Sequence, residues 1–145
     1  MKVLVDTCIW SMALRRRDSQ DSIAVRKLKE LIRDFRVQMI GPIRQELLSG
    51  LRSDEQYQRL REYLSAFSDL PIQTGDYEKA AEFYNLAKRN GLQGSNTDFL
   101  ICAVSRNYKM PIFTEDQDFS HFVEIIPIEL SKHVISCGGR KNGSP

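Results

Sequence analysis

The beginning of the chain constrains the fold more than any other stretch. Val3, Leu4 and Val5 are consecutive apolar residues with no polar residue between them. This pattern is typical of a strand covered on both faces, as in a parallel sheet flanked by helices. Asp6 follows directly, at the carboxyl end of the expected strand, where open α/β sheets bind their ligands. The sequence therefore predicts a carboxylate at the mouth of a crevice.

Further short apolar segments are expected to complete this sheet. They cover residues 37–40, 70–73, 111–113 and 123–126. Between the first two of the expected strands, apolar residues recur at helical spacing at Ala24, Leu28, Leu31, Ile32 and Phe35. Strands that alternate with helices are typical of βαβ units, so the chain is predicted to be an α/β protein with a mostly parallel sheet.

Two later helices are expected to bury one apolar face each. The first, capped by Ser53, should bury Tyr57, Leu60, Leu64 and Phe67. The second, capped by Asp76, should bury Tyr77, Ala80, Ala81, Tyr84 and Ala87. The polar stretch Arg15–Ser22 is interpreted as a loop that can move, and residues 138–145, which contain no apolar side chain, are predicted to be a disordered tail.

The size and composition of the chain suit one soluble domain, expected to span residues 1–137. A chain of 145 residues falls in the commonest size range for a domain. No apolar run approaches the ~20 residues of a membrane span. The three cysteines, Cys8, Cys102 and Cys137, fit neither a disulfide framework nor a zinc signature, which indicates reduced thiols and a cytoplasmic protein.

The net charge of +2 is too small to indicate nucleic-acid binding, but the arginines cluster locally. The cluster consists of Arg15, Arg16, Arg17, Arg44, Arg52, Arg59 and Arg61. Two interpretations stay open: a solvated basic helix surface, or a rim that contacts phosphates beside the acidic mouth.

Four acids are expected at the same edge of the sheet: Asp6, Glu46, Asp98 and Asp116. Each has a simpler explanation when taken alone, since Asp98 and Asp116 could cap helices and Glu46 could lie on a helix surface. Together they would repel one another unless they share protons or bind a cation. Ligands that are all oxygen suit Mg²⁺ or Mn²⁺, which support phosphoryl chemistry. Thr7 and Thr114 could fix a carboxylate or hold a water beside the ion.

Other chemistries are poorly supported. The chain contains neither G-x-x-x-x-G-K-[ST] nor G-x-G-x-x-G, so no phosphate-binding or dinucleotide-binding loop is indicated. His121 and His133 are the only histidines, and neither accompanies a nucleophile motif. An aspartyl-phosphate enzyme is disfavoured because Cys8 stands where a second acid would be expected.

The motifs that carry these acids resemble the PIN-domain nucleases, and within them the VapC-type toxins of type II toxin–antitoxin systems. The resemblance covers roughly residues 1–130 and rests on V-L-V-D-T at 3–7, P-I-R-Q-E-L-L-S-G at 42–50, T-D-F-L-I-C-A at 97–103 and T-E-D-Q-D-F at 114–119. One departure is Cys102, at a position where alanine is common, which should affect helix packing and not chemistry.

The resemblance implies a three-layer α/β/α sandwich and Mg²⁺- or Mn²⁺-dependent cleavage of single-stranded RNA. It also implies a homodimer and a small antitoxin protein that covers the acidic mouth. By this similarity Asp6, Glu46, Asp98 and Asp116 form the catalytic set. Asp6, Asp98 and Asp116 would be metal ligands, with Asp6 and Asp98 the direct ones. Thr7, Thr114 and Asp118 would have supporting roles.

Two alternatives stay open at this point. The chain could be a PIN nuclease that processes RNA without acting as a toxin, or a non-catalytic binding module that kept the fold. The complete set of acids argues against the second, and a titration showing no divalent-ion binding would favour it.

Overall fold

The computed structural model describes residues 1–15 and 22–132. The predicted tail and most of the predicted loop at 15–22 lie outside these residues. One sheet contains β1 (Val3–Val5), β2 (Val37–Gln38) and β3 (Ile112–Phe113). The helices are α1 (Thr7–Arg15), α2 (Ile23–Arg33), α3 (Gly41–Leu48), α4 (Asp54–Leu64), α5 (Thr74–Arg89), α6 (Asn96–Tyr108) and α7 (Asp118–Phe122).

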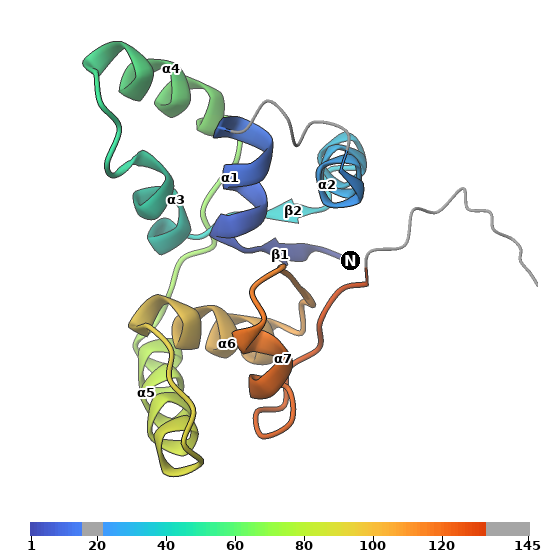
Figure 1. Ribbon diagram of the computed structural model, residues 1–145, viewed down its shortest axis with the longest axis vertical. Coiled ribbons are helices and arrows are strands. Elements are labelled where there is room, and N and C mark those ends of the chain that lie inside the picture. The colour runs from blue at the N-terminus through green and yellow to red at the C-terminus, as the bar shows by residue number, and fades with distance from the viewer. Residues whose placement is uncertain (16–21, 133–145) are drawn as a thin grey trace, which may run out of the picture.

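The sheet is parallel and has β1 in its centre. The strand order is β2-β1-β3, with Leu4 of β1 paired both to Gln38 and to Ile112. Helices α1, α2 and α3 lie on one side of the sheet, and α5, α6 and α7 on the other (Figure 1). All of Val3, Leu4 and Val5 are buried, as a strand between two helical layers requires. The predicted α/β sandwich is therefore confirmed.

Two of the predicted strands are wrong. Residues 70–73 form no strand, because the chain makes a single bridge between Asp69 and Met39 and then enters α5. Residues 123–126 form turns, since Ile125 and Ile126 donate their backbone N–H groups to the Phe122 carbonyl. The chain instead returns to the sheet at Leu130, which bridges to Ile112. The apolar side chain of Ile126 is buried without a strand around it.

The predicted buried faces of α4 and α5 also need correction. On α4 only Leu64 is buried, Leu60 is partly covered, and Tyr57 is exposed. On α5 the prediction holds for Ala80 and Ala87 but is wrong for Tyr77, Ala81 and Tyr84, which are exposed. The buried face contains Asp76 and Phe83 instead. Asp76 is not the N-cap: Gln73 is, and the Asp76 carboxylate accepts the Gln73 backbone N–H to complete a capping box.

The parallel arrangement determines where the acids lie. Asp6 ends β1, and Thr114 follows β3, so both are at the carboxyl edge of the sheet. After β2, Ile40 leads into α3, whose first turn contains Pro42 where no backbone N–H is needed. Gly50, with φ of 77°, lets the chain turn after α3 in a conformation that favours glycine. Among residues 1–15 and 22–132, no helix has the length and apolar character to cross a membrane.

Candidate active site

Asp6 is the most deeply buried of the predicted site acids, with 6% of its surface exposed. Its Oδ1 accepts the backbone N–H of Thr7 at 2.7 Å, and its Oδ2 accepts the Thr114 hydroxyl at 2.7 Å. The carboxylate is therefore held from two segments: by Thr7, the first residue of α1, and by Thr114, which follows β3. Burial raises the pKa of Asp6, these two hydrogen bonds lower it in part, and the charge of Asp98 raises it again.

Thr114 also orients Asp116. The Thr114 hydroxyl oxygen accepts the backbone N–H of Asp116 at 2.9 Å while its proton goes to Asp6. Oδ1 of Asp116 in turn accepts the backbone N–H of Asp118 at 2.9 Å, which starts α7. Asp118 is thus connected to the site through its backbone, and its own carboxylate is exposed at the beginning of α7.

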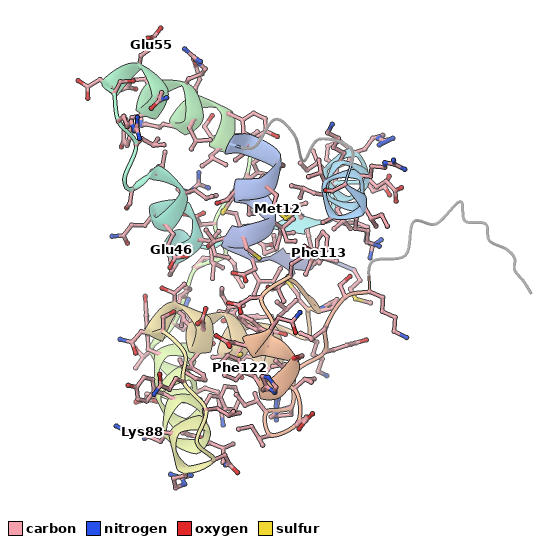
Figure 2. All side chains as sticks on the ribbon, in the orientation of Figure 1. Met12, Glu46, Glu55, Lys88, Phe113 and Phe122 are labelled. Atoms are coloured by element: carbon pink, nitrogen blue, oxygen red, sulfur yellow. The ribbon has the colours of Figure 1, made fainter. Side chains whose placement is uncertain are left out.

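Glu46 reaches the site from α3. It is exposed, and its Oε1 accepts the hydroxyl of Thr7 at 2.6 Å. Figure 2 shows Glu46 on the side of α3 that faces α6. Thr7 therefore links two acids, because its backbone N–H holds Asp6 and its hydroxyl holds Glu46.

Asp98 lies in the first turn of α6 and is half-buried. Its Oδ2 accepts the Ser95 backbone N–H at 3.0 Å, and Ser95 Oγ accepts the Asp98 N–H at 3.1 Å. Ser95 is the N-cap of α6, and one oxygen of Asp98 completes its capping box, so a role in helix capping accounts for that oxygen. Burial nevertheless raises the pKa of Asp98 beyond what the Ser95 bonds offset, and the charges of Asp116 and Glu46 raise it further.

Asp98 interacts electrostatically with each of the other three acids. The charge of Asp98 raises the pKa of Asp6, and the charges of Asp116 and Glu46 raise the pKa of Asp98. The four acids come from four separate segments: the end of β1, α3, the start of α6 and the loop after β3. A depression of about 400 Å³ opens beside them, lined by Cys8, Ser11, Met12, Glu115 and Asp116.

Cys8 is a contact that sequence reasoning missed. Its Sγ lies 3.6 Å from Asp6 Oδ2 and 3.5 Å from Thr114 Oγ1, and it accepts the Glu115 backbone N–H at 3.4 Å. Burial and the charge of Asp6 raise the pKa of this thiol, so it stays protonated and acts as a weak donor. Its position two residues after Asp6 was the available signal. Cys102, by contrast, is buried in α6 as a packing residue.

The donor set fits a hard divalent cation in its chemistry, because it contains carboxylate oxygens and no histidine. Within residues 1–15 and 22–132, no three His, Cys, Asp or Glu side chains lie close enough together to hold a metal ion as they stand. Mg²⁺ usually takes one or two protein carboxylates and fills its other positions with water and substrate phosphate. The buried Asp6 with its raised pKa is the observation that best fits such an ion.

Within the described part of the arginine cluster, several side chains are engaged with other residues. Arg44 pairs with Asp69 at 2.8 Å, and Arg59 lies 3.4 Å from Glu55 on the exposed surface of α4. Arg44 is therefore not available to bind a phosphate. The side chains of Arg15, Arg16 and Arg17 lie outside the described residues.

Residues 3–125 match the family model of the PIN domain. The match covers the strand that ends in Asp6, the helix of Glu46, the α6 turn with Asp98 and the loop with Asp116. The chain belongs to the PIN domain family, as its motifs predicted.

The relatives that the chain matches are of the predicted VapC type. Ribonuclease VapC11 of Mycobacterium tuberculosis is 29% identical over 129 residues, which cover 88% of this chain and 96% of the relative. The fold is similar to that of FitAcB from Neisseria gonorrhoeae, with a TM-score of 0.72, 20% identity and coverage of 90% of this chain and 97% of the other. A toxin–antitoxin complex from Klebsiella pneumoniae gives a TM-score of 0.62 at 20% identity, with coverage of 89% and 100%.

Proposed function

We propose that this chain is an endoribonuclease that hydrolyses phosphodiester bonds of single-stranded RNA with the help of Mg²⁺ or Mn²⁺. The observation that supports this most strongly is the convergence of Asp6, Glu46, Asp98 and Asp116 from four segments, with the pKa values of Asp6 and Asp98 raised. Carboxylates that crowd in this way weaken the fold unless a cation joins them. The similarity to a VapC ribonuclease agrees with this chemistry.

Asp6, Asp98 and Asp116 are the residues that would hold the ion. When bound, a divalent ion lowers the pKa of a water and neutralises charge on the phosphate. Thr7 and Thr114 orient the Asp6 carboxylate through one hydrogen bond to each of its oxygens. Oε1 of Glu46 is occupied by the Thr7 hydroxyl, so Oε2 is the oxygen that would accept a proton from the attacking water.

The experiment is RNA cleavage by the purified protein in Mg²⁺, in Mn²⁺ and in EDTA, with Asp6→Asn, Asp98→Asn and the control Asp76→Asn. Cleavage that needs the ion, persists in Asp76→Asn and is lost in both site variants would support the proposal. A well-folded wild type that binds no divalent ion and cuts no RNA would instead favour a binding module with this fold.

We also propose that the protein acts as the toxin of a toxin–antitoxin pair in the cytoplasm. The solved toxin–antitoxin complex with a similar fold supports this partner, and the two described cysteines, Cys8 and Cys102, are free thiols. Growth arrest on expression, relieved by the product of a small neighbouring gene, is the expected result. Cleavage of RNA without growth arrest would indicate an RNA-processing nuclease.

A homodimer completes the proposal. The side chains of Tyr77 and Tyr84 on α5 are 55% and 38% exposed, and with Pro42 of α3 they line an apolar depression that a second copy would bury. Analytical ultracentrifugation should show a dimer for the wild type and a monomer for Tyr84→Glu. A monomeric wild type would refute this part.

A further inference from the structure

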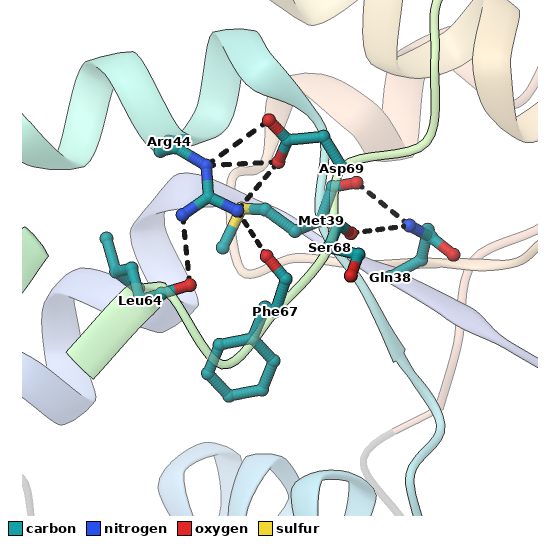
Figure 3. Close-up of polar contacts among 7 residues, drawn as sticks. All are labelled: Gln38, Met39, Arg44, Leu64, Phe67, Ser68 and Asp69. Carbon is teal, nitrogen blue, oxygen red and sulfur yellow. Dashed lines mark hydrogen bonds and ion pairs between the residues drawn. The ribbon is translucent and has the colours of Figure 1, made fainter. Parts of the chain in front are cut away.

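The side chain of Arg44, on α3, makes five hydrogen bonds, and all of their acceptors lie in the segment of residues 64–69. Its Nε bonds both carboxylate oxygens of Asp69, at 3.0 and 3.3 Å, and its Nη2 bonds Asp69 Oδ1 at 2.8 Å (Figure 3). Its Nη1 donates to the Leu64 carbonyl at 2.9 Å, and Nη2 also donates to the Phe67 carbonyl. Only 23% of the side chain is exposed, so this planar fork is held in one orientation.

The segment that Arg44 holds is joined to the sheet just before α3 begins. Asp69 bridges to Met39, and the Leu70 N–H donates to the Met39 carbonyl at 2.9 Å. Gln38 adds a second connection, because its Nε2 donates to the carbonyls of Met39 and Ser68. The segment from Leu64 to Asp69 is therefore held by Arg44, within α3, and by Gln38 and Met39, just before α3.

The same segment also contacts α1, the helix that begins at Thr7. The ring of Phe67 packs edge-on against Trp10 of α1, with ring centroids 5.1 Å apart. Phe67 thus adds a connection between α3 and α1 to the direct packing of these helices, because its carbonyl accepts from Arg44 and its ring contacts Trp10.

The orientation of α3 matters because few contacts fix the Glu46 side chain in the site. α3 is eight residues long and buries only Ile43 and Leu47. The Glu46 side chain is joined to the rest of the site by the 2.6 Å hydrogen bond from the Thr7 hydroxyl on α1. A small rotation of α3 would break it.

We propose that Arg44 is a positioning residue: by holding the 64–69 segment it sets α3 at the angle at which Glu46 meets the Thr7 hydroxyl. This inference rests on the proposed nuclease function for its effect on the reaction, although not for its effect on α3.

The test compares Arg44→Gln, Arg44→Lys and Asp69→Asn with a matched control, Arg36→Gln. Arg36 donates to the Met1 carbonyl at 2.9 Å and precedes β2, at the opposite end of that strand from α3, so its loss removes an arginine hydrogen bond away from the site. At a temperature where every variant is folded, kcat should fall on the order of ten-fold in Arg44→Gln with little change in KM, because a displaced group affects the reaction more than binding. Arg44→Lys should not restore kcat, since lysine lacks the planar guanidinium group and its several N–H donors.

A double-mutant cycle with Glu46→Gln separates positioning from a general loss of structure. If Arg44 acts through Glu46, Arg44→Gln should cause no further loss of kcat in the Glu46→Gln background. An equal factor in both backgrounds would overturn the inference. The emission of Trp10, the single tryptophan, reports whether the Phe67 contact has changed.

Amide hydrogen exchange tests the inference without any reaction. Residues 41–48 should exchange faster in Arg44→Gln and Asp69→Asn than in Arg36→Gln. Unchanged exchange in α3 would overturn the inference even if the wild type cuts RNA. An inert wild type with faster exchange in the Arg44 variants would refute only the proposed nuclease.

Discussion

Asp6 and Asp76 are two buried aspartates with opposite properties. They are 6% and 3% exposed, and each accepts several hydrogen bonds. Asp76 at the start of α5 accepts the Gln73 backbone N–H, Asn107 Nδ2 and Tyr108 Oη, at 2.8 to 2.9 Å. Burial raises its pKa, but these three bonds outweigh burial and the pKa is lowered. For Asp6, burial and the charge of Asp98 outweigh the bonds from Thr114 and Thr7, and the pKa is raised.

Under the proposed function, this difference distinguishes a structural acid, Asp76, from a functional one, Asp6. Asp76 ties the beginning of α5 to the end of α6 and has the partners that a buried carboxylate needs. Asp6 lies among other carboxylates, and its protein donors do not compensate for burial. A cation would complete the surroundings of Asp6, whereas Asp76 needs none. The predictions below test this contrast.

The largest effect is expected from Asp6→Asn. RNA cleavage should fall by at least about a hundred-fold, the scale seen when a charge-stabilising group is removed from an active site. The ion-free protein should become more stable at neutral pH, because an amide avoids the cost of a buried charge near Asp98. Cleavage assays and thermal unfolding check the two parts; a variant that cuts RNA like the wild type would contradict the role of Asp6.

Divalent ions should stabilise the wild type. At a hundred times the dissociation constant, Mg²⁺ or Mn²⁺ should add about 2.7 kcal/mol to the free energy of unfolding. Asp76→Asn should keep this increment and Asp6→Asn should lose it. Unfolding curves at a series of ion concentrations measure it, and an equal increment in both variants would mean that the ion binds elsewhere.

Asp76→Asn should reduce stability without affecting the reaction. Three donors point at the two oxygens of Asp76, and asparagine keeps only one of these oxygens as an acceptor. At least one donor therefore loses its acceptor, at a cost of roughly 1–3 kcal/mol. Denaturant unfolding gives the loss, and kcat measured at a temperature where the variant is folded should equal that of the wild type.

The two acids should also shift stability in opposite directions with pH. Because the folded pKa of Asp76 is lowered, its contribution is present above the unfolded value of about 4 and is lost as the pH falls below it. Because the folded pKa of Asp6 is raised, its contribution is present below about pH 4 and is lost as the pH rises through the folded value. Melting temperatures of the wild type and both variants in ion-free buffers from pH 3 to about 7 measure this.

The smallest effects come from a matched pair of donor deletions. Thr114→Val removes a bond to Asp6 and should raise the Asp6 pKa further, so that the acidic limb of the pH–rate profile moves upward and kcat falls a few-fold. Tyr108→Phe removes a hydrogen bond to Asp76 and should lower the free energy of unfolding slightly, with an unchanged pH–rate profile. Equal pH profiles in both variants would contradict the distinction between the two acids.

The sequence predicted what depends on local pattern. An unbroken apolar run predicted the central strand, which the structure contains. The positions of Asp6 and Asp116 after strands, of Asp98 in a first helical turn and of Glu46 in the helix after β2 predicted one acidic site. The match to the PIN domain agrees with those motifs.

The features that could not be predicted depend on distant partners. Helical spacing on α5 fits two overlapping faces. The structure buries Phe83, whereas Tyr84 stays 38% exposed although its ring contacts Phe99 of α6. The acceptors of Arg44 are 20 to 25 residues away in the sequence. Nothing near Asp76 indicates that Asn107 and Tyr108 will reach it, and so it resembles an ordinary helix cap.

The most direct test of the account is the titration of individual aspartate carboxyl carbons by NMR, with and without Mg²⁺. Asp6 should titrate above the ordinary pKa of an aspartate without the ion and move sharply downward when Mg²⁺ is added. Asp76 should titrate below the ordinary value and be unaffected by the ion. An Asp6 that titrates normally, or that does not respond to Mg²⁺ any more than Asp76 does, would contradict the claim that its burial is completed by a cation.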